Sequence, residues 1–357
     1  SMKVIVDLQL YDQDLGGGKT FVDALLPRLV SDNKDIQFLL IGPKSIINLF
    51  PNSLDNVRIF LRTPPRSHWF RVLVSLYVSF LSLIYRDHIL WGPLNYVGLL
   101  PNSFKKTVVT IHDVMCLDRP EYFSRLGLFF RRLQLLSALK FATDVVSVSH
   151  FTMSRVKHYS RSFSCRFHVS YEALYLPAEP IKGPSPVENS FLLFVGVGRE
   201  NKNLKFLVKS FDELVEEYGY EGNLVIAGKI SESDREVLKL ETKFPSKLLF
   251  PGFIREEDLG LYYENTDAFV FPSTYEGFGL PPMEALYYGA RLVLSDIPVF
   301  KELYSSVAVL SEVSDPKIFA TAILRCLQMP NRDLRADFWE KFSWKSSSEL
   351  YSSIIGE

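Results

Sequence analysis

The feature that most constrains the fold is residues 268–289, which read Ala-Phe-Val-Phe-Pro-Ser-Thr-Tyr-Glu-Gly-Phe-Gly-Leu-Pro-Pro-Met-Glu-Ala-Leu-Tyr-Tyr-Gly. The apolar run 268–271 predicts a buried parallel strand that ends before Pro272. A glycine-rich turn follows. Pro281 and Pro282 then suit the first turn of a helix, where a missing N–H costs nothing. The stretch therefore predicts a strand, a tight turn and a helix, which is the unit of α/β folds.

The turn also carries polar groups that suit a ligand. Glu276 lies in the loop before the predicted helix, and Glu284 lies in its first turns, facing the same crevice. The amides of Phe278, Gly279 and Leu280 are donors at a helix N-terminus, which favours an anion. Carboxylates for sugar hydroxyls beside amides for a phosphate would fit a sugar nucleotide. The alternative is that both glutamates are solvated surface residues.

The whole string Pro-Ser-x-Tyr-Glu-Gly-Phe-Gly-Leu-Pro-Pro-x-Glu-Ala resembles the E-x7-E element of the family 4 glycosyltransferases, which are retaining enzymes with the two-lobed GT-B fold. The resemblance implies that Glu276 binds hydroxyls of the donor sugar and that Glu284 holds the ribose hydroxyls of the nucleotide. It extends over motifs from about residue 105 to residue 345, and the first hundred residues match only in outline.

The length and the order of the expected elements indicate the architecture. At 357 residues with 47% hydrophobic residues, the chain is large enough for two domains with cores of their own. Strands and helices alternate in both halves. We therefore predict an α/β protein with two doubly wound Rossmann-like lobes facing across a cleft. The expected acceptor-side lobe is 2–175, the linker is 176–189 and the nucleotide-sugar lobe is 190–340. By resemblance, the helix in 341–357 crosses back to the first lobe.

Charge is distributed unevenly along the chain. Residues 1–172 hold 21 Lys and Arg against 13 Asp and Glu, whereas residues 173–357 hold 19 against 28. A basic first half attracts an anionic acceptor or an anionic membrane surface. The alternative is a basic surface that balances the acidic lobe.

No nucleic-acid partner is expected. Three cysteines without metal spacing, and a first strand that starts at Lys3, favour a cytoplasmic protein, on the inner face of the membrane if it contacts lipid.

Two expected helices in the first lobe bear on the membrane question. Residues 69–85 are strongly apolar, but the uninterrupted run from Val72 is 14 residues, shorter than the roughly 20 of a spanning helix. Serines recur within it at helical spacing, which favours a buried or lobe-packing helix over a peripheral membrane role. The helix 125–140 carries four basic residues among large apolar ones, with no acid between Glu121 and Asp144. It is a candidate interfacial patch, or a cationic helix with one face in the core.

The first lobe offers two further candidate ligand groups. Gly16, Gly17 and Gly18 lie in the loop before a helix expected at 20–30, and they lack the spacing of a Walker A motif. Their amides can approach a ligand. His112 follows the expected strand 105–111, at its carboxyl end. In the family, the loop that corresponds to Gly16–Gly18 faces the donor diphosphate and the acceptor. A histidine at the position of His112 reaches the donor sugar and pyrophosphate.

The second lobe begins with an apolar strand that ends at Gly196, which we place with the donor-binding residues. Lys202 and Arg199 lie between this strand and a helix at 204–218, where they suit a diphosphate leaving group. Lys202 aligns with the family through Lys-Asn-Leu. The family's arginine position is occupied by Val197, so Arg199 is displaced. By resemblance, the nucleotide base packs near Phe253.

No metal or other cofactor is expected, because cationic side chains and helix dipoles would take the place of a metal ion. Asp12-Gln-Asp14 has metal-pair spacing but is interpreted as a solvated turn. The leading hypothesis is mannosyl or similar transfer from a GDP-sugar to a glycan or lipid-linked glycan in bacterial surface polysaccharide synthesis. A UDP-sugar donor, a sugar-nucleotide epimerase and a catalytically silent partner subunit remain as alternatives. A nicotinamide dehydrogenase is disfavoured, because neither lobe has Gly-x-Gly-x-x-Gly.

Overall fold

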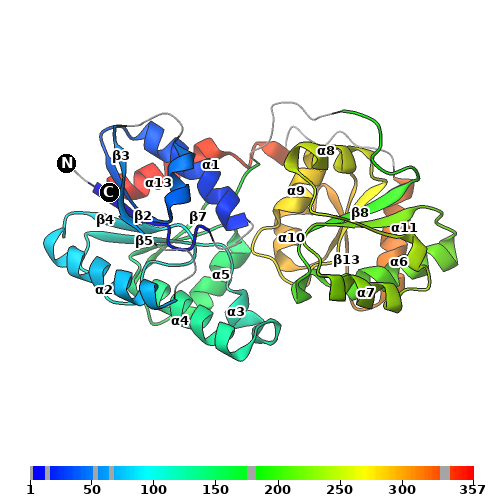
Figure 1. Cartoon of the computed structure of the whole chain (residues 1–357), viewed down its shortest axis with the longest axis horizontal. Coiled ribbons are helices and arrows are strands. Elements are labelled where there is room, and N and C mark those ends of the chain that lie inside the picture. Colours follow the sequence, from blue (N-terminus) through cyan, green and yellow to red (C-terminus); the bar gives the residue numbers. More distant parts are fainter. Residues whose placement is uncertain (1–2, 13–16, 51–54, 64–67, 175–181, 330–337) are drawn as a thin grey trace. The chain divides into compact units, whose positions relative to one another are not determined.

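The structure, a computed structural model, describes residues 3–12, 17–50, 55–63, 68–174, 182–329 and 338–357, without side chains for 68–71. It divides into two compact units (Figure 1). The first unit contains residues 1–175 and 342–357, and the second contains residues 176–341. Each unit is built on one parallel sheet.

The described residues of the first unit form a 7-stranded sheet in the order β3-β2-β1-β4-β5-β6-β7. All of its pairs are parallel. Its inner strands are largely buried, as expected for a sheet covered on both faces, whereas its two edge strands are only partly buried. The strands are β1 (Lys3–Asp7), β2 (Gln37–Gly42), β3 (Val57–Arg62), β4 (Ile89–Gly92), β5 (Lys106–Ile111), β6 (Asp144–Ser147) and β7 (Arg166–Val169).

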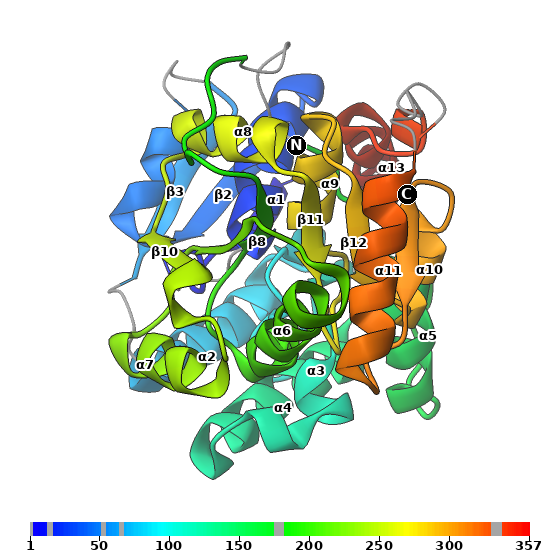
Figure 2. The same cartoon turned by 90° about the vertical axis from the view of Figure 1, so that its right-hand side faces the viewer.

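Helices cover both faces of this sheet (Figures 1 and 2). One face carries α1 and α13, which pack against each other, and the other carries α2 and α4. The buried core on the second side joins β-strand residues such as Leu90 and Val109 to Val78 of α2 and Leu139 of α4. The helical segments are α1 (Gly17–Asp32), η1 (Lys44–Leu49), α2 (His68–Ile84), α3 (Met115–Asp118), η2 (Pro120–Tyr122), α4 (Arg125–Phe141), α5 (His150–Tyr159) and α13 (Trp344–Gly356).

Two expectations for the first unit need correction. Helix α1 begins at Gly17 instead of residue 20, so Gly17 and Gly18 belong to its first turn and not to a loop. Helix α2 forms as predicted, but it is buried on one face only, because large apolar side chains such as Leu73 and Phe80 are 61% and 58% exposed. The interpretation of this helix as a core element is therefore wrong for its outer face.

The second unit repeats the same strand order. Its 6-stranded sheet runs β10-β9-β8-β11-β12-β13, again with every pair parallel. Helix α6 packs against α11, and α8 packs against α9. The strands are β8 (Phe191–Val195), β9 (Asn223–Ala227), β10 (Leu248–Gly252), β11 (Ala268–Phe271), β12 (Leu292–Ser295) and β13 (Ala308–Ser311). The helical segments are η3 (Glu200–Lys202), α6 (Leu204–Tyr218), α7 (Glu232–Glu241), η4 (Pro245–Lys247), α8 (Glu256–Asn265), α9 (Leu280–Tyr287), α10 (Pro298–Tyr304) and α11 (Pro316–Gln328).

This strand order determines where a ligand would bind in the second unit. The chain runs outward from β8 to β10 on one side of the sheet and from β11 to β13 on the other. The order therefore reverses between β8 and β11, which pair through Leu192 and Ala268. In open parallel sheets, ligands bind in the crevice outside the carboxyl ends of the strands at this point. The loops after β8 and β11 carry most of the candidate site residues.

Candidate active site

The centre of the site is an ion pair between the loops that follow β8 and β11. Lys202 at the end of η3 places its Nζ 2.6 Å from Oε1 of Glu276. The two side chains are only 12% and 13% exposed, so little water screens the pair. The Lys202 ammonium also lies 4.7 Å from the centre of the Phe271 ring. The structure thus brings together two residues that the sequence analysis assigned to one ligand.

Further hydrogen bonds join these two loops. Asn201, which is buried, donates from Nδ2 to the carbonyl oxygen of Tyr275 at 2.9 Å and accepts from the amide of Thr274 at 2.8 Å. Asn203 adopts a left-handed conformation with φ of 58° and donates to the carbonyl oxygen of Pro272 at 3.4 Å. The backbone on both sides of the Lys202–Glu276 pair is therefore fixed by asparagine side chains from one loop to the other.

Helix α9 starts beside this pair, at Leu280. The preceding Gly279 has φ of 96°, and a Cβ there would lie 2.7 Å from Phe300, so only glycine fits. Its carbonyl oxygen accepts a 2.6 Å hydrogen bond from the buried Tyr304 hydroxyl. Because Pro281 and Pro282 have no N–H, Leu280 supplies the amide among the first three helical residues. The side chains of Phe278 and Leu280 are buried, which leaves their backbone as the part able to meet a ligand.

Glu284 lies in the second turn of α9, partly exposed, and accepts a 2.8 Å hydrogen bond at Oε2 from the hydroxyl of Tyr263. Burial raises the pKa of Glu284, and the hydrogen bond from Tyr263 opposes that shift without cancelling it. Tyr263 on α8 is only 1% exposed, and burial raises its own pKa well above the usual value. The tyrosine therefore remains a donor and fixes the orientation of the Glu284 carboxylate.

The other candidates in the second unit lie at the ends of neighbouring strands. Gly196 follows β8, and a Cβ on it would lie 3.9 Å from Cε of Lys202. The adjacent Gly228, with φ of 114°, approaches so closely that its Cβ would lie 1.8 Å from the Gly196 carbonyl oxygen. Phe253 follows β10 and is 71% exposed, so its ring is available to a ligand. Arg199 is also exposed and does not join the Lys202–Glu276 pair.

In the first unit, His112 follows β5 and both of its ring nitrogens have partners. Nδ1 lies 2.9 Å from Oε1 of Glu172, and Nε2 lies 2.8 Å from the carbonyl oxygen of Pro93. Burial lowers the pKa of His112, but the hydrogen bond and the charge of Glu172 outweigh burial and raise it. A protonated ring would donate to both partners, because a carboxylate and a carbonyl oxygen only accept. Gly17 and Gly18 open α1, whereas Gly16 lies outside the described residues.

Three residues that the sequence analysis did not identify complete these arrangements. Tyr263 orients Glu284, Tyr304 holds Gly279, and Glu172 holds His112. Glu172 is only 3% exposed, and its partner His112 is 60 positions away. The pattern of apolar and polar residues along the sequence does not identify a buried acid of this kind. The available signal was weak: Glu172 follows the last strand of the first lobe, at a carboxyl end.

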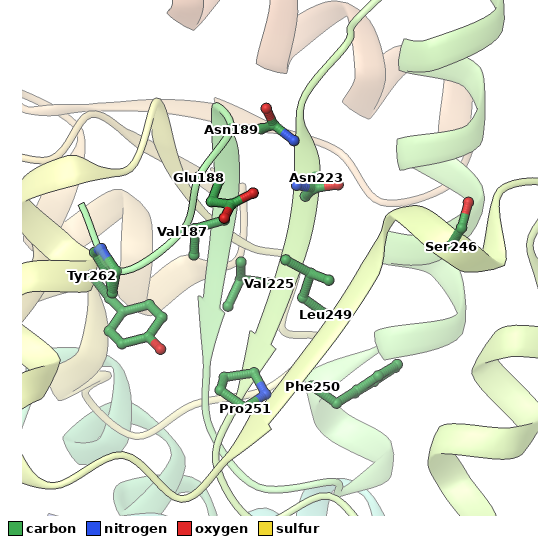
Figure 3. Close-up of a pocket in the computed structure, with 11 residues that line it drawn as sticks. Val187, Glu188, Asn189, Asn223, Val225, Ser246, Leu249, Phe250, Pro251 and Tyr262 are labelled. Carbon is green, nitrogen blue, oxygen red and sulfur yellow. The ribbon is translucent and has the colours of Figure 1, made fainter.

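A separate hollow of about 590 Å³ lies elsewhere in the second unit, beside the amino ends of β8 and β9 (Figure 3). It is lined by Asn189, Asn223 and Tyr262 among others, and by none of the predicted site residues.

Within the described ranges, no three His, Cys, Asp or Glu side chains gather closely enough to hold a metal ion. Asp12 accepts a hydrogen bond from Ser45, and Asp14 falls outside those ranges. No helix among the described residues is long and apolar enough to cross a membrane.

Comparison with known proteins agrees with this arrangement. The family described as "Glycosyl transferases group 1" matches residues 177–341, nearly the whole second unit. O-antigen chain mannosyltransferase B of Escherichia coli is 26% identical over 255 residues, covering 68% of this chain and 66% of that protein. O-antigen chain mannosyltransferase RfbU of Salmonella typhimurium is 26% identical over 316 residues, covering 86% and 84%. The chain spans just under two thirds of the first relative, and 32% of the 27% identical WbdA of Escherichia coli.

Solved structures support the fold. Anabaena Alr3699/HepE, solved in complex with UDP and glucose, superposes with a TM-score of 0.70 at 16% identity, over 100% of both chains. Trehalose-6-phosphate synthase OtsA superposes with a TM-score of 0.68 at 13% identity, over 100% of this chain and 99% of that one. Both confirm the predicted pair of Rossmann-like sheets as a GT-B fold. Residues 177–341 therefore match the group 1 glycosyl transferases, and the chain has the GT-B fold.

Proposed function

We propose that the chain transfers a hexose, with retention of configuration, from a nucleoside diphosphate sugar to a hydroxyl of a glycan or lipid-linked glycan. Mannose is the proposed sugar, because two relatives are named O-antigen chain mannosyltransferase B and RfbU, and a GDP-sugar is the proposed donor. The proposed setting is bacterial surface polysaccharide synthesis at the inner face of an anionic membrane, to which the basic first half of the chain would be attracted.

The observation that carries the proposal is the Lys202–Glu276 pair beside the start of α9. A lysine ammonium has three N–H donors, and Glu276 takes one of them at 2.6 Å. The remaining donors can meet a departing diphosphate while Glu276 keeps an oxygen for hydroxyls of the donor sugar. The amides of Phe278, Gly279 and Leu280 would add partial positive charge on the phosphate side.

The other residues have supporting roles in this proposal. Glu284, oriented by Tyr263, would accept hydrogen bonds from the two ribose hydroxyls, and Phe253 would pack on the base. Arg199 would add charge to the diphosphate, and Gly196 would let the ligand approach the backbone. His112 would act as a cation held by Glu172, together with the amides at the start of α1.

Chemically, the sugar's C1–oxygen bond to the diphosphate breaks as the acceptor oxygen forms a bond to C1 on the same face, and the acceptor proton leaves with the diphosphate. Positive groups placed where negative charge develops are the protein's contribution to this step. Removing such a group typically slows a reaction by about 10²–10³. No metal ion is required on this proposal, and EDTA should leave the rate unchanged.

The first test is thermal stabilisation by a panel of nucleoside diphosphates and their sugars. A ligand at 100 times its Kd should add about 2.7 kcal/mol to the free energy of unfolding. Glu284→Ala should abolish the shift, whereas Glu232→Ala, at a carboxylate that is 80% exposed on α7, should preserve it. If no nucleotide shifts the melting temperature, the donor site is wrong.

The donor that causes a shift is then incubated with and without glycan acceptors. Transfer with a retained anomeric configuration supports the proposal, and the stabilising nucleotide decides between GDP and UDP. Donor turnover without any acceptor would identify an epimerase instead. Nucleotide binding without turnover under all conditions would identify a silent partner subunit.

A further inference from the structure

An apolar surface on the first unit is not explained by sugar transfer. Seventeen large apolar side chains are exposed among the described residues, and eleven of them lie on only two helices, α2 and α4. On α2 they are Val72, Leu73, Leu76, Tyr77, Phe80, Leu83 and Ile84, and on α4 they are Leu126, Phe129, Leu133 and Leu136. Contiguous exposed apolar surface of this kind marks a site of interaction. We name it the α2/α4 surface.

From Val72 to Ile84, the exposed face of helix α2 is largely apolar. Val74, Val78 and Leu81 point into the core, and Ser75 and Ser82 are buried as well, whereas the seven apolar side chains of α2 named above are 38% to 61% exposed. Residues 72–85 contain no charged side chain. The exposed positions 73, 76, 77, 80, 83 and 84 recur every three or four residues and form one stripe about 16 Å long. A surface helix normally exposes charged residues to water, so this apolar stripe indicates a surface that binds another molecule.

Helix α4 adds positive charge beside the stripe. Arg125, Arg131 and Lys140 are exposed between its apolar side chains. No Asp or Glu occurs between Glu121 and Asp144, so no acid on this helix neutralises them. A fourth cation, Arg132, is engaged by a 3.2 Å hydrogen bond to the carbonyl oxygen of Cys116.

The two helices form one surface because they cover the same face of the first sheet (Figures 1 and 2). They are joined by the loop after β4. Ser75 of α2 accepts from the amide of Leu99 at 3.2 Å, and Ser137 of α4 donates to the carbonyl oxygen of Gly98 at 3.4 Å. Residues on the exposed sides of α2 and α4 therefore face solvent next to each other.

We propose that the α2/α4 surface docks on the face of a lipid bilayer that carries anionic headgroups. Phosphate groups would pair with Arg125, Arg131 and Lys140, while the side chains of the α2 stripe enter the boundary of the acyl region. The site is interfacial, because no described helix is long and apolar enough to span. This inference rests on the proposed function in one respect: a lipid-linked acceptor would lie in the membrane on which the surface docks.

Charge complementarity favours lipid over a second copy of this chain. A two-fold dimer places the same patch on both sides of the interface. The cations of α4 would then face the same cations, with no acidic residue in 122–143 to oppose them. An anionic bilayer supplies both the negative charge and the apolar layer that this surface lacks.

The test is co-sedimentation of the full chain with vesicles, without nucleotide. Vesicles of phosphatidylcholine are compared with vesicles of phosphatidylcholine and phosphatidylglycerol in equal parts. Binding is expected to the anionic vesicles and to weaken as salt is raised, since ions screen exposed charges. Equal binding to both compositions, or to neither, would overturn the proposal.

Two variants divide the apolar from the charged contribution. Leu76→Ser with Phe80→Ser should weaken binding to anionic vesicles by at least about tenfold, because two deep apolar contacts are lost. Arg125→Glu with Lys140→Glu should weaken it comparably, as each cation near the surface strengthens binding about fivefold. The matched control is Val237→Ser with Leu240→Ser on α7, exposed by 38% and 84%, which should change nothing.

Folding and self-association are checked separately. The variants replace exposed side chains, so their melting temperatures should stay at the wild-type value, and a stabilising nucleotide should still act. The nucleotide test and the vesicle test therefore give independent results, and an error in the proposed donor site would not change vesicle binding. Self-association that disappears in the Leu76→Ser, Phe80→Ser variant, without vesicle binding in the wild type, would assign the surface to a second copy and overturn the proposal.

Discussion

At the scale of single residues, Lys202 and Glu276 cannot be understood separately. Each is nearly buried, and each supplies the opposite charge that makes the other's burial tolerable. Replacing Lys202 would leave the Glu276 carboxylate without its cation, and replacing Glu276 would release the ammonium to another orientation. Loss of activity in either single variant therefore reports on the pair, and only a double-mutant cycle separates the two roles.

The His112–Glu172 pair leads to a pH-dependent prediction. A histidine whose pKa is raised by folding stabilises the protein fully below its unfolded value of about 6.5, and this contribution is lost as pH rises through the folded pKa. Glu172→Gln removes the charge that raises the pKa. The variant should therefore be less stable than wild type at pH 6, and the difference should shrink toward pH 9. Denaturant unfolding across that range measures it.

The control for this prediction is Glu121→Gln, which alters a carboxylate of the same unit that is 55% exposed. Its stability difference from wild type should be small and should not vary with pH. If Glu172→Gln instead shows a constant loss from pH 6 to pH 9, then His112 is neutral and its proposed protonation is wrong.

The sequence could indicate the candidate site residues that lie within one continuous motif, and their roles stay predictions. Glu276 and Glu284 are separated by eight positions, and the glycine turn and prolines between them determine where both stand. Tyr263 donates to Glu284 from 21 positions away and on another helix, α8. Local patterns carry no information on such a contact, because the meeting of α8 and α9 depends on how both pack on the sheet.

At the scale of elements, helix α9 has a glycine with positive φ before its start and another after its end. Gly279 has φ of 96° with Phe300 2.7 Å from where a Cβ would stand, and Gly289 has φ of 85° with nothing within 4 Å. Gly289→Ala should cost about 1 kcal/mol, for the backbone conformation alone. Gly279→Ala should cost about 1–3 kcal/mol and also abolish stabilisation by nucleotide, since α9 must shift.

Thermal unfolding of both variants, with and without the stabilising nucleotide, checks this prediction. Gly289→Ala acts as the matched control, because it introduces the same methyl group at the other end of the same helix. Equal losses in the two variants, with nucleotide stabilisation kept in both, would mean that contact with Phe300 does not hold the start of α9.

Helix α2 shows why burial was harder to predict than the helix itself. The serines at 75, 79 and 82 favoured a buried or lobe-packing helix, and the serines at 75 and 82 are buried, at 2% and 0% exposure. They face inward because the loop after β4 has backbone amides that need acceptors, and Ser82 accepts from Ser103 at 2.8 Å. The apolar residues are consequently left on the outside. Because serines face inward and apolar side chains face outward, the sequence pattern of this helix does not show which of its faces is buried.

At the scale of the whole molecule, the chain builds the first unit, then the second, and then returns to the first. Helix α13 packs against α1, and Tyr351 is completely buried with its hydroxyl 2.6 Å from Oγ1 of Thr110 on β5. Ser348 donates to Asp32 at 2.7 Å, which ties α13 to the end of α1. The first unit therefore lacks part of its core until α13 has been made.

This topology predicts unequal effects of removing residues 342–357. The first unit would lose Tyr351, Ile354 and Ile355, which are at most 2% exposed. Each such side chain contributes about 1.5–3 kcal/mol by burial, comparable together to the whole stability of a typical domain of about 5–15 kcal/mol. The first unit should then be digested rapidly by protease, while the second unit, which contains no part of α13, should resist.

Tyr351→Phe tests the same interface more gently, because it keeps the ring and removes only the hydrogen bond to Thr110. Its expected cost is about 1 kcal/mol, with both units still resistant to protease. Limited proteolysis followed by mass spectrometry identifies which unit survives in each variant. A first unit that resists digestion without α13 would show that β1 to β7 and their helices form a sufficient core, and that the returning helix only covers it.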